Sequence, residues 1–561
     1  DGRHDGKQRR PVFRARVVAI AWIVVIVGCM DPCSASVSAP SSSSDADDTV
    51  PRIALSTLSV AQFRRFLRDN RPLLLTGVTS EWAAAREWIG ADGTLDAEAL
   101  SARHGACVVP VVACDHGEYG EQPRHEAPLS EYLEQWRRGE QAHYLKDWHF
   151  VRDCPDAAAY TTPAPFADDW LNWWWSEQRG GHDDYRFVYL GPAGSWTPLH
   201  HDVMLSYSWS ANVCGRKRWL LFPPSETAKL LSRTGRQLAS DVRAADADEF
   251  PMLATARCVE VVQEAGEALF VPSGWHHQVE NLEPTLSVNH NWFNGFSVLA
   301  LWCFLRAELD AVRAAIDDCR ASCTAVEWEA QCERVMACDV AINVSEFFAL
   351  LVARVGLLDD AHGHGAAEEG AAEEDVQTGE DEWLLDDEVW RRRAVELRLT
   401  DNDGDGPCVS ELGDAASTAY AMLQVLRVLS GLAQPPALHH LFEWRAGAIV
   451  CGDAAPADLW AAGTVVTVRA LQGATQHNGK RGKVLRYNSD AGRYETELET
   501  GEQLKIKPAN LEKAAAGDDG DDRVDGKDAD EHRYARSRQR VLRLARRAQG
   551  LLERLAPHVR N

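Results

Sequence analysis

Two short runs of this chain carry side chains that can hold a metal ion. The run PLHHDV contains His200 and Asp202, and the run GWHHQV contains His276 and His277. Two imidazoles and one carboxylate on one face of an iron ion leave its other coordination positions open. Non-heme Fe(II) centres of this kind bind a co-substrate and O2 at the open positions. The two runs therefore predict an oxidising metal centre.

The spacing within the runs selects two of the ligands and leaves the third undecided. If PLHHDV is a strand, His200 and Asp202 point to one face and His201 to the other, because side chains alternate along a strand. The third ligand must then come from a neighbouring strand. Spacing alone does not choose between His276 and His277.

The segments that must position these residues have the pattern of short strands. Runs rich in aromatic and β-branched residues alternate with Gly and Pro turns, namely YRFVYLG, SYSWSANV, KRWLLFPP, EALFVPS and TLSVNHNWF. Many short strands framed by helices are typical of a double-sheet jelly roll. We therefore expect a mixed α+β fold, with a double-stranded β-helix of the cupin type and flanking helices.

Length and composition indicate a folded protein of several units. A chain of 561 residues is too long for one core, and 45% hydrophobic residues with 20 tryptophans support a large interior. The net charge of −25 argues against binding nucleic acid, whose phosphates would be repelled. We divide the chain into a basic and apolar N-terminal segment with a linker (1–50), the jelly-roll domain with a helical extension (51–351), an acidic linker (352–390), a helix–loop–helix (391–435), an SH3-like small β-barrel (463–511), and an acidic linker with a basic amphipathic helix (512–561).

The N-terminal segment has the layout of a targeting sequence. A basic stretch precedes the apolar run 17–30, and small polar residues follow it. The run is short for a membrane span, so a signal peptide, an anchor and a gene-model artefact are alternatives. A real signal or anchor would bring membrane contact and would place the protein in the ER membrane or lumen.

Two further segments carry weaker functional signals. Asp401, Asp403 and Asp405 match alternate positions of an EF-hand calcium loop, but Leu412 stands where the loop requires a bidentate glutamate. We expect a degenerate loop, with Ca2+ as the alternative. The basic helix 533–560 carries an apolar face at helical spacing. It packs on its own protein or a dimer partner, or it binds a membrane surface or an acidic partner.

A cluster of cysteines allows two interpretations. Four lie close together in a helical stretch, Cys319, Cys323, Cys332 and Cys338. We expect buried free thiols, with two disulfides in an oxidising compartment as the alternative.

Longer motifs around the metal runs resemble the JmjC family of Fe(II)/2-oxoglutarate oxygenases. The resemblance runs through GPAGSWTPLHHD, SWSANVCGRKRWLLFPP, GEALFVPSGWHHQVENLE and TLSVNHNW. It implies His277 as the third ligand, and Fe(II), 2-oxoglutarate and O2 as the reactants. It also implies that Lys217, seventeen residues after His200, binds the distal carboxylate of 2-oxoglutarate. The further contacts to the co-substrate that it implies are Thr197, Tyr144, Asn289 and Ser210.

Within this family, residues 51–351 are most similar to a subgroup that hydroxylates a lysine of the eukaryotic translation release factor. The similarity implies a protein lysyl hydroxylase in the cytoplasm, the nucleus or both. A histone or protein demethylase, a tRNA hydroxylase and a non-catalytic cupin-type scaffold are the alternatives. The retained ligands and Lys217 argue against a scaffold.

Overall fold

The structure is a computed structural model, and it forms two compact units. The larger unit comprises Asp1–Ala446 and Tyr534–Asn561, and the smaller comprises Gly447–Arg533. The residues described are 49–114, 122–139, 143–179, 183–362, 381–399, 412–442, 465–468, 475–488, 493–506, 510–513 and 526–559. The apolar run 17–30 and Asp401, Asp403 and Asp405 lie outside them.

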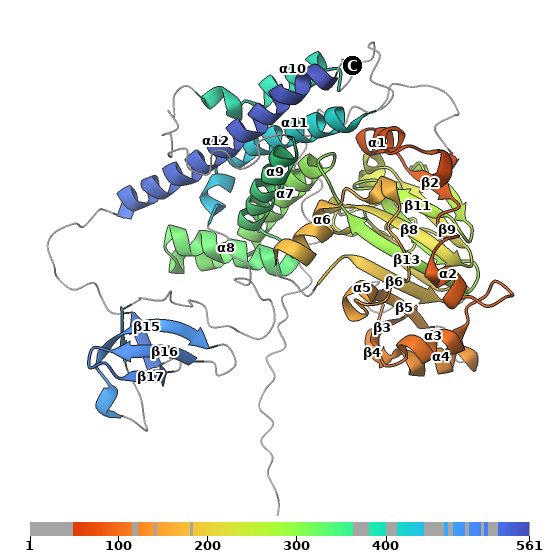
Figure 1. The fold of residues 1–561 in the computed structure, drawn as a ribbon, viewed down its shortest axis with the longest axis horizontal. Helices are drawn as coiled ribbons and strands as arrows, with labels where there is room; N and C mark the ends of the chain where they lie inside the picture. Colours follow the sequence, from red (N-terminus) through yellow and green to blue (C-terminus); the bar gives the residue numbers. More distant parts are fainter. Residues whose placement is uncertain are drawn as a thin grey trace, which may run out of the picture. The chain divides into compact units, whose positions relative to one another are not determined.

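A large mixed sheet forms one wall of the larger unit (Figure 1). Within the described ranges its strand order is β1-β2-β11-β8-β13-β6-β5-β3-β4, with β1 parallel to β2 and the other pairs antiparallel. The strands are β1 (Arg52–Ala54), β2 (Leu73–Thr76), β3 (Val108–Ala113), β4 (Arg124–Pro128), β5 (His143–Trp148), β6 (Arg186–Gly191), β8 (Tyr207–Cys214), β11 (Ala268–Val271) and β13 (Thr285–Trp292).

A smaller antiparallel sheet faces it and carries the metal runs. Its order in the described chain is β10-β9-β12-β7. The strands are β7 (Trp196–His200), β9 (Lys217–Phe222), β10 (Val259–Gln263) and β12 (His276–Asn281). Strands β6 to β13 thus divide between the two sheets, four in each, and the chain changes sheet at every step except from β9 to β10, as in a double-stranded β-helix. The structure confirms the fold expected from the sequence.

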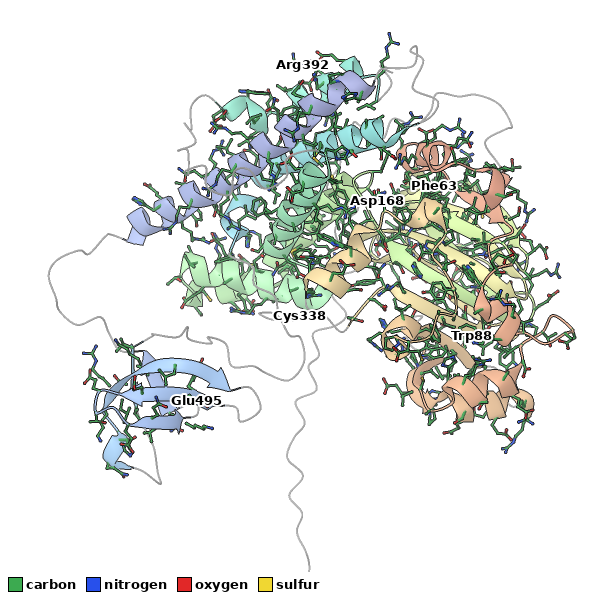
Figure 2. All side chains as sticks on the ribbon, viewed as in Figure 1. Phe63, Trp88, Asp168, Cys338, Arg392 and Glu495 are labelled. Atoms are coloured by element: carbon green, nitrogen blue, oxygen red, sulfur yellow. The ribbon has the colours of Figure 1, made fainter. Side chains whose placement is uncertain are left out.

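Strand β11 shows why some strands of this fold are continuous apolar runs in the sequence. Ala268 and Phe270 belong to the core between the large sheet and the helices, whereas Leu269 and Val271 belong to the core between the sheets. Both faces of the strand are buried, so the usual polar alternation is absent. On the helical side lies Phe63 of α1 (Figure 2). It packs edge-on against Phe270, with ring centroids 5.1 Å apart.

Short helices pack around the sheets, and longer ones form a helical body beside them (Figure 1). Helix α1 begins with a capping box between Ser59 and Gln62, and α8 ends where Ala341 adopts a left-handed conformation. The helices are α1 (Val60–Arg68), α2 (Ala83–Glu87), α3 (Ala97–His104), α4 (Leu129–Arg137), α5 (Phe150–Asp153), α6 (Trp170–Trp173), α7 (Val298–Ala315), α8 (Ala325–Val340), α9 (Val344–Ala361), α10 (Asp387–Glu396), α11 (Asp414–Leu432) and α12 (Gly526–Val559).

Helix α12 packs its apolar face on its own protein. The side chains that the sequence places on that face are all buried in the core of the larger unit, namely Val541, Leu544, Ala545, Ala548, Leu551, Leu552 and Leu555. The basic side chains meet acidic groups of the same unit: Arg547 lies 2.8 Å from Asp359, and Arg538 lies 2.5 Å from Glu382. Of the interpretations of this segment, the structure shows the helix that packs on its own chain.

The larger unit extends beyond residue 351, which was the expected end of the jelly-roll domain, because α10, α11 and α12 contribute to the same core.

Leu412 stands at the position where a calcium loop needs its glutamate. It is fully buried, and its N–H donates to the carbonyl of Ala61. An apolar side chain cannot supply the bidentate carboxylate that this position of the loop requires. The alternative of Ca2+ is therefore unsupported.

Every described cysteine is a free thiol, and of the four in the helical stretch only Cys332 is buried.

Within the described ranges no single helix is long and apolar enough to cross a membrane. The bent pair α8 and α9 meets that test only when the two are taken together. Both helices contribute side chains to the core.

The smaller unit is an antiparallel sheet in the order β17-β16-β15-β14-β18 over the described residues. Its strands are β14 (Val465–Val468), β15 (Arg481–Asn488), β16 (Arg493–Leu498), β17 (Gln503–Ile506) and β18 (Leu511–Lys513). Val466, Val484 and Tyr494 form its core. The small β-unit is thus present, and its described strands form an open order rather than a closed barrel.

Removing a side chain from the buried face of α12 tests this packing. Leu552 is fully buried, so Leu552→Ala is expected to lower the free energy of unfolding by about 2–5 kcal/mol. Arg543→Ala on the exposed face is the control and should change it by less than about 0.5 kcal/mol. Urea unfolding followed by circular dichroism measures both. Equal stability of Leu552→Ala and wild type would show that α12 is not part of the core.

Candidate metal centre

His200, Asp202 and His277 converge at one end of the small sheet. His200 ends β7, and His277 is paired with it directly across the ladder to β12. The two ring centroids are 4.3 Å apart, and His277 Nε2 lies 4.0 Å from Asp202 Oδ1. One ligand atom of each residue lies within 4.8 Å of the others. Because a ligand atom lies about 2 Å from its metal ion, three ligand atoms this close together need only small side-chain movements to share one ion.

Backbone carbonyls decide which nitrogen of each imidazole is available. His200 Nδ1 donates to the carbonyl of Pro198 at 2.7 Å, and His277 Nδ1 donates to that of Trp275 at 3.2 Å. Nε2 of each ring is therefore left as a lone-pair donor, as in metal-binding histidines. Burial, and next His277 and Lys146, lower the pKa of His200 well below its ordinary value. The ring is thus held in the neutral form that a metal requires.

Asp202 supplies the carboxylate and lies just beyond the strand. Strand β7 ends at His200, but the backbone at Asp202 is still extended (φ −67°, ψ 154°), so side-chain alternation continues to this residue. Its Oδ2 atom is buried and has no hydrogen-bond partner in the described chain. An unpaired buried carboxylate oxygen is costly unless a cation binds it. Two neutral imidazoles and this carboxylate fit a ferrous ion.

An irregularity in the ladder places Thr197 on the ligand side. Thr197 pairs with Val279 and His200 with His277, so two residues of β7 lie opposite one residue of β12. A bulge of this kind reverses the side-chain parity of the bulged strand. Thr197, three residues before His200, therefore shares a face with it, where regular alternation would oppose them. Thr197 is buried.

Lys217 lies deep in the jelly roll among hydroxyl groups. Its Nζ donates to Ser287 Oγ at 2.6 Å and to Ser210 Oγ at 3.4 Å. Both serines donate to Asn289 Oδ1 at 3.0 Å. The structure thus brings Lys217, Ser210 and Asn289 together, as expected. The sequence analysis missed Ser287, although alternation along TLSVNHNW places it on the same face as Asn289.

The ammonium group of Lys217 is without a carboxylate partner in the described chain. Burial, and then the charge of Lys146, lower the pKa of Lys217 to about 7. The neighbouring arginines turn away, as alternation predicts: Arg218 lies 2.5 Å from Glu280, and Arg216 lies 2.7 Å from Glu283. Lys217 is therefore available to a ligand carboxylate, which would restore its charged form.

Strand β5 contributes two more side chains to this region. Tyr144 is buried, with its ring 6.0 Å from that of Tyr189, and Tyr189 in turn lies 5.7 Å from Lys217 Nζ. Lys146 follows Tyr144 by two residues, and its charge lowers the pKa of both His200 and Lys217. The sequence analysis missed Lys146. Alternation from Tyr144 along YLKDW is the signal that could have found it.

His201 and His276 lie together away from the three ligands. Their ring centroids are 5.2 Å apart. Burial, and then His201 and His277, lower the pKa of His276 to about 3. The structure therefore places His277, rather than His276, with His200 and Asp202.

Comparison with known proteins gives this site a family. Residues 59–297 match the family described as a cupin-like domain. The chain is 43% identical over 302 residues to the 2-oxoglutarate and iron-dependent oxygenase JMJD4 of Gallus gallus, covering 52% of this chain and 70% of the relative. It is 42% identical over 330 residues to human JMJD4, covering 55% and 78%. It is 39% identical over 321 residues to the arginine-specific demethylase JMJ20 of Arabidopsis thaliana, covering 54% and 69%.

The jelly roll and its two histidines and one aspartate define a cupin-type oxygenase centre. The chain belongs to the JmjC family of 2-oxoglutarate and iron-dependent oxygenases. The expected cofactor iron and co-substrate 2-oxoglutarate follow from this membership, and His200, Asp202 and His277 are the residues that would hold the iron.

Replacing single histidines tests the assignment of ligands. His200→Ala is expected to weaken Mn(II) binding, as a redox-stable substitute for Fe(II), by more than about 100-fold, since lost outer partners alone cost 10–100-fold. His201→Ala removes the adjacent ring, which faces His276, and should leave the affinity within about threefold. Isothermal titration calorimetry measures both. Equal losses in the two variants would contradict the assignment.

Lys217 gives a second prediction, on co-substrate binding. Lys217→Met keeps the length of the side chain and removes its charge, and should weaken 2-oxoglutarate binding about 10- to 100-fold. Arg218→Met, on the opposite face, is the control. In the wild type the ammonium form is lost as pH rises through the pKa of about 7. The dissociation constant of 2-oxoglutarate should therefore rise above neutral pH, by at most about tenfold per pH unit. A pH-independent constant would contradict this role.

Proposed function

We propose that this protein is an Fe(II)- and 2-oxoglutarate-dependent oxygenase that hydroxylates a lysine side chain of a protein, with a translation release factor as the substrate. The observation that carries the oxygenase part is the convergence of His200, Asp202 and His277 within 4.8 Å, with the buried Lys217 in the same jelly roll. The resemblance of residues 51–351 to release-factor lysyl hydroxylases supports the choice of substrate.

Different residues of the chain would serve different parts of this reaction. When bound, iron and 2-oxoglutarate supply an oxidant made from O2 that attacks an unactivated C–H bond. His200, Asp202 and His277 would hold the metal through one face and leave the other face open. Lys217, with Ser210 and Ser287 around it, would orient the co-substrate by its distal carboxylate. One substrate C–H bond becomes C–OH, while 2-oxoglutarate and O2 give succinate and CO2.

The position of the substrate carbon decides the product. Hydroxylation of a lysine side-chain carbon gives a stable alcohol. Hydroxylation of an N-methyl carbon gives a hemiaminal, which releases formaldehyde and leaves the methyl group removed. Arginine demethylation is therefore the second candidate, favoured by the 39% identity to JMJ20 of Arabidopsis thaliana. We further propose that the protein acts in the cytoplasm or the nucleus, where a release factor or a histone is accessible.

Turnover on defined peptides tests the proposal. With Fe(II), ascorbate and 2-oxoglutarate, a release-factor peptide should gain the mass of one oxygen atom on lysine and yield succinate. The same peptide with Arg in place of that lysine is the matched substrate control. Asp202→Ala should lower turnover at least about 100-fold. Formaldehyde release from a methyl-arginine peptide, with no oxidation of the lysine peptide, would favour the second candidate and overturn the first.

A further inference from the structure

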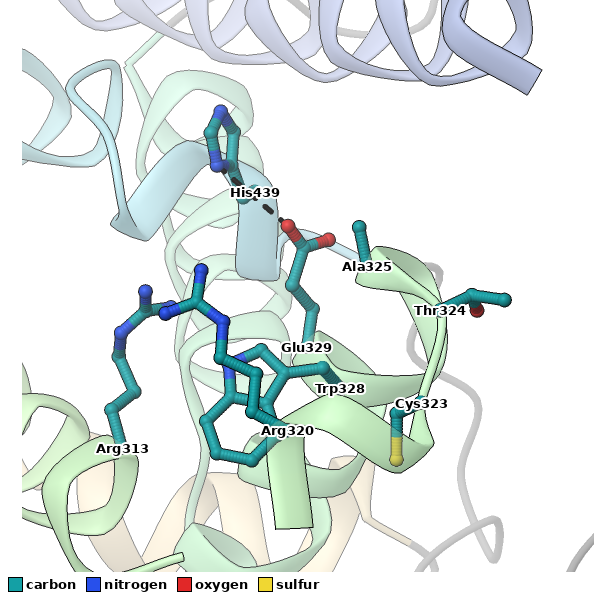
Figure 3. Close-up of a pocket in the computed structure, with 8 residues that line it drawn as sticks. All are labelled: Arg313, Arg320, Cys323, Thr324, Ala325, Trp328, Glu329 and His439. Atoms are coloured by element: carbon teal, nitrogen blue, oxygen red, sulfur yellow. Dashed lines mark ion pairs between the residues drawn. The ribbon is translucent and has the colours of Figure 1, made fainter. Parts of the chain in front are cut away.

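A cavity in the helical body lies among elements that the metal centre does not use. Its volume is about 240 Å3, and it is bordered by α7, α8 and the short helices η10 (Asp317–Ser322) and η12 (Ala437–His440) (Figure 3). The side chains that matter here are Arg313, Arg320, Trp328, Glu329 and His439. None of the three metal ligands, nor Lys217, borders it.

The cavity is lined by hydrogen-bond donors, and one of them has no acceptor in the described chain. Trp328 is only 3% exposed, and its Nε1–H has no partner in the described chain. The guanidinium carbon of Arg320 lies 5.9 Å from the centroid of this indole, and the guanidinium group of Arg313 lies beside that of Arg320 in Figure 3. Arg313 donates to His440 Nε2 at 2.9 Å, and no carboxylate of the described residues lies within ion-pair distance of it. A buried N–H without an acceptor is unfavourable, so the indole of Trp328 indicates a missing acceptor.

The acidic groups nearby are engaged elsewhere. Glu329 Oε1 accepts from the hydroxyl of Tyr534 at 2.9 Å and lies 3.7 Å from His439 Nδ1, so its carboxylate faces η12 and α12 (Figure 3). Asp317 approaches Arg320 only to 3.9 Å, and both side chains are mostly exposed. Among the described residues Arg313 thus has no ion-pair partner, and Arg320, at the mouth of the cavity, has only this long contact.

Two neighbouring guanidinium groups repel each other unless an anion lies between them. Here they share the cavity with an indole N–H that also only donates. We propose that this cavity binds a small oxyanion, a carboxylate or a phosphate, held by Arg313, Arg320 and the indole N–H of Trp328. Arginine suits this role because its planar fork matches the oxygens of carboxylate and phosphate groups. Arg320, exposed at the mouth, leaves a path of entry.

Direct titration tests the proposal. Sodium phosphate and sodium succinate are titrated separately into the full chain by calorimetry, in a Lys217→Met background so that succinate does not report the co-substrate pocket. At least one anion should bind saturably. Arg313→Gln and Arg320→Gln should each weaken it about tenfold or more, since a hydrogen bond to a charged group contributes about 1.5–3 kcal/mol. Trp328→Phe keeps the ring, removes the N–H and should weaken it about threefold to tenfold.

The control is Arg334→Gln, on α8 but outside the cavity, where the guanidinium group donates to Gln331 at 2.5 Å. It should leave the affinity unchanged. Binding of phosphate alone or of succinate alone supports the site and identifies the class of anion. Circular dichroism confirms that each variant is folded, and Arg320→Gln, at an exposed side chain, is the variant least affected in folding. Absence of saturable binding of both anions, or binding that Arg313→Gln and Arg320→Gln leave unchanged, overturns the proposal.

Discussion

The direct pairing of His200 with His277 across the ladder between β7 and β12 fixes the metal centre. It brings two imidazoles from residues far apart in the chain to one place without any loop having to close. The carbonyls of Pro198 and Trp275, each two residues before its histidine, then rotate both rings so that Nε2 is free. Only Asp202 depends on backbone beyond the strand. The site is therefore as rigid as the small sheet, which favours a ligand set with constant geometry.

The same sheet relates the ligand His277 to the buried Lys217. Strand β9 lies beside β12, with Leu221 opposite His277 and Lys217 opposite Asn281, so the lysine is four residues along the ladder from His277. Strands of the large sheet provide Ser210, Ser287 and Asn289 from the facing wall. A displacement of one sheet against the other would separate Lys217 from its hydroxyl partners. The packing of Leu269 and Val271 between the sheets therefore also keeps Lys217 beside these hydroxyl groups.

Much of this could be predicted from the sequence, because alternation along strands is a local rule. It placed His200 with Asp202 and turned Arg216 and Arg218 away from Lys217. The many short strands separated by Gly and Pro turns indicated the double-stranded β-helix. The choice of His277 over His276 needed the family resemblance, since it depends on register between strands. Ser287 and Lys146 were missed because their roles depend on which strands become neighbours. The contact between Leu412 and α1 is likewise a tertiary event that the calcium-loop pattern cannot reveal.

The order of segments along the chain has a consequence for biosynthesis. Helix α12 completes the core of the larger unit, yet it follows the smaller unit in the sequence. Until α12 is synthesised, the surfaces of α9 and α10 that it contacts remain exposed. The smaller unit is thus an insertion between two segments of the larger unit. A ribosome that stalls within it would leave an intact metal site beside an unfinished core.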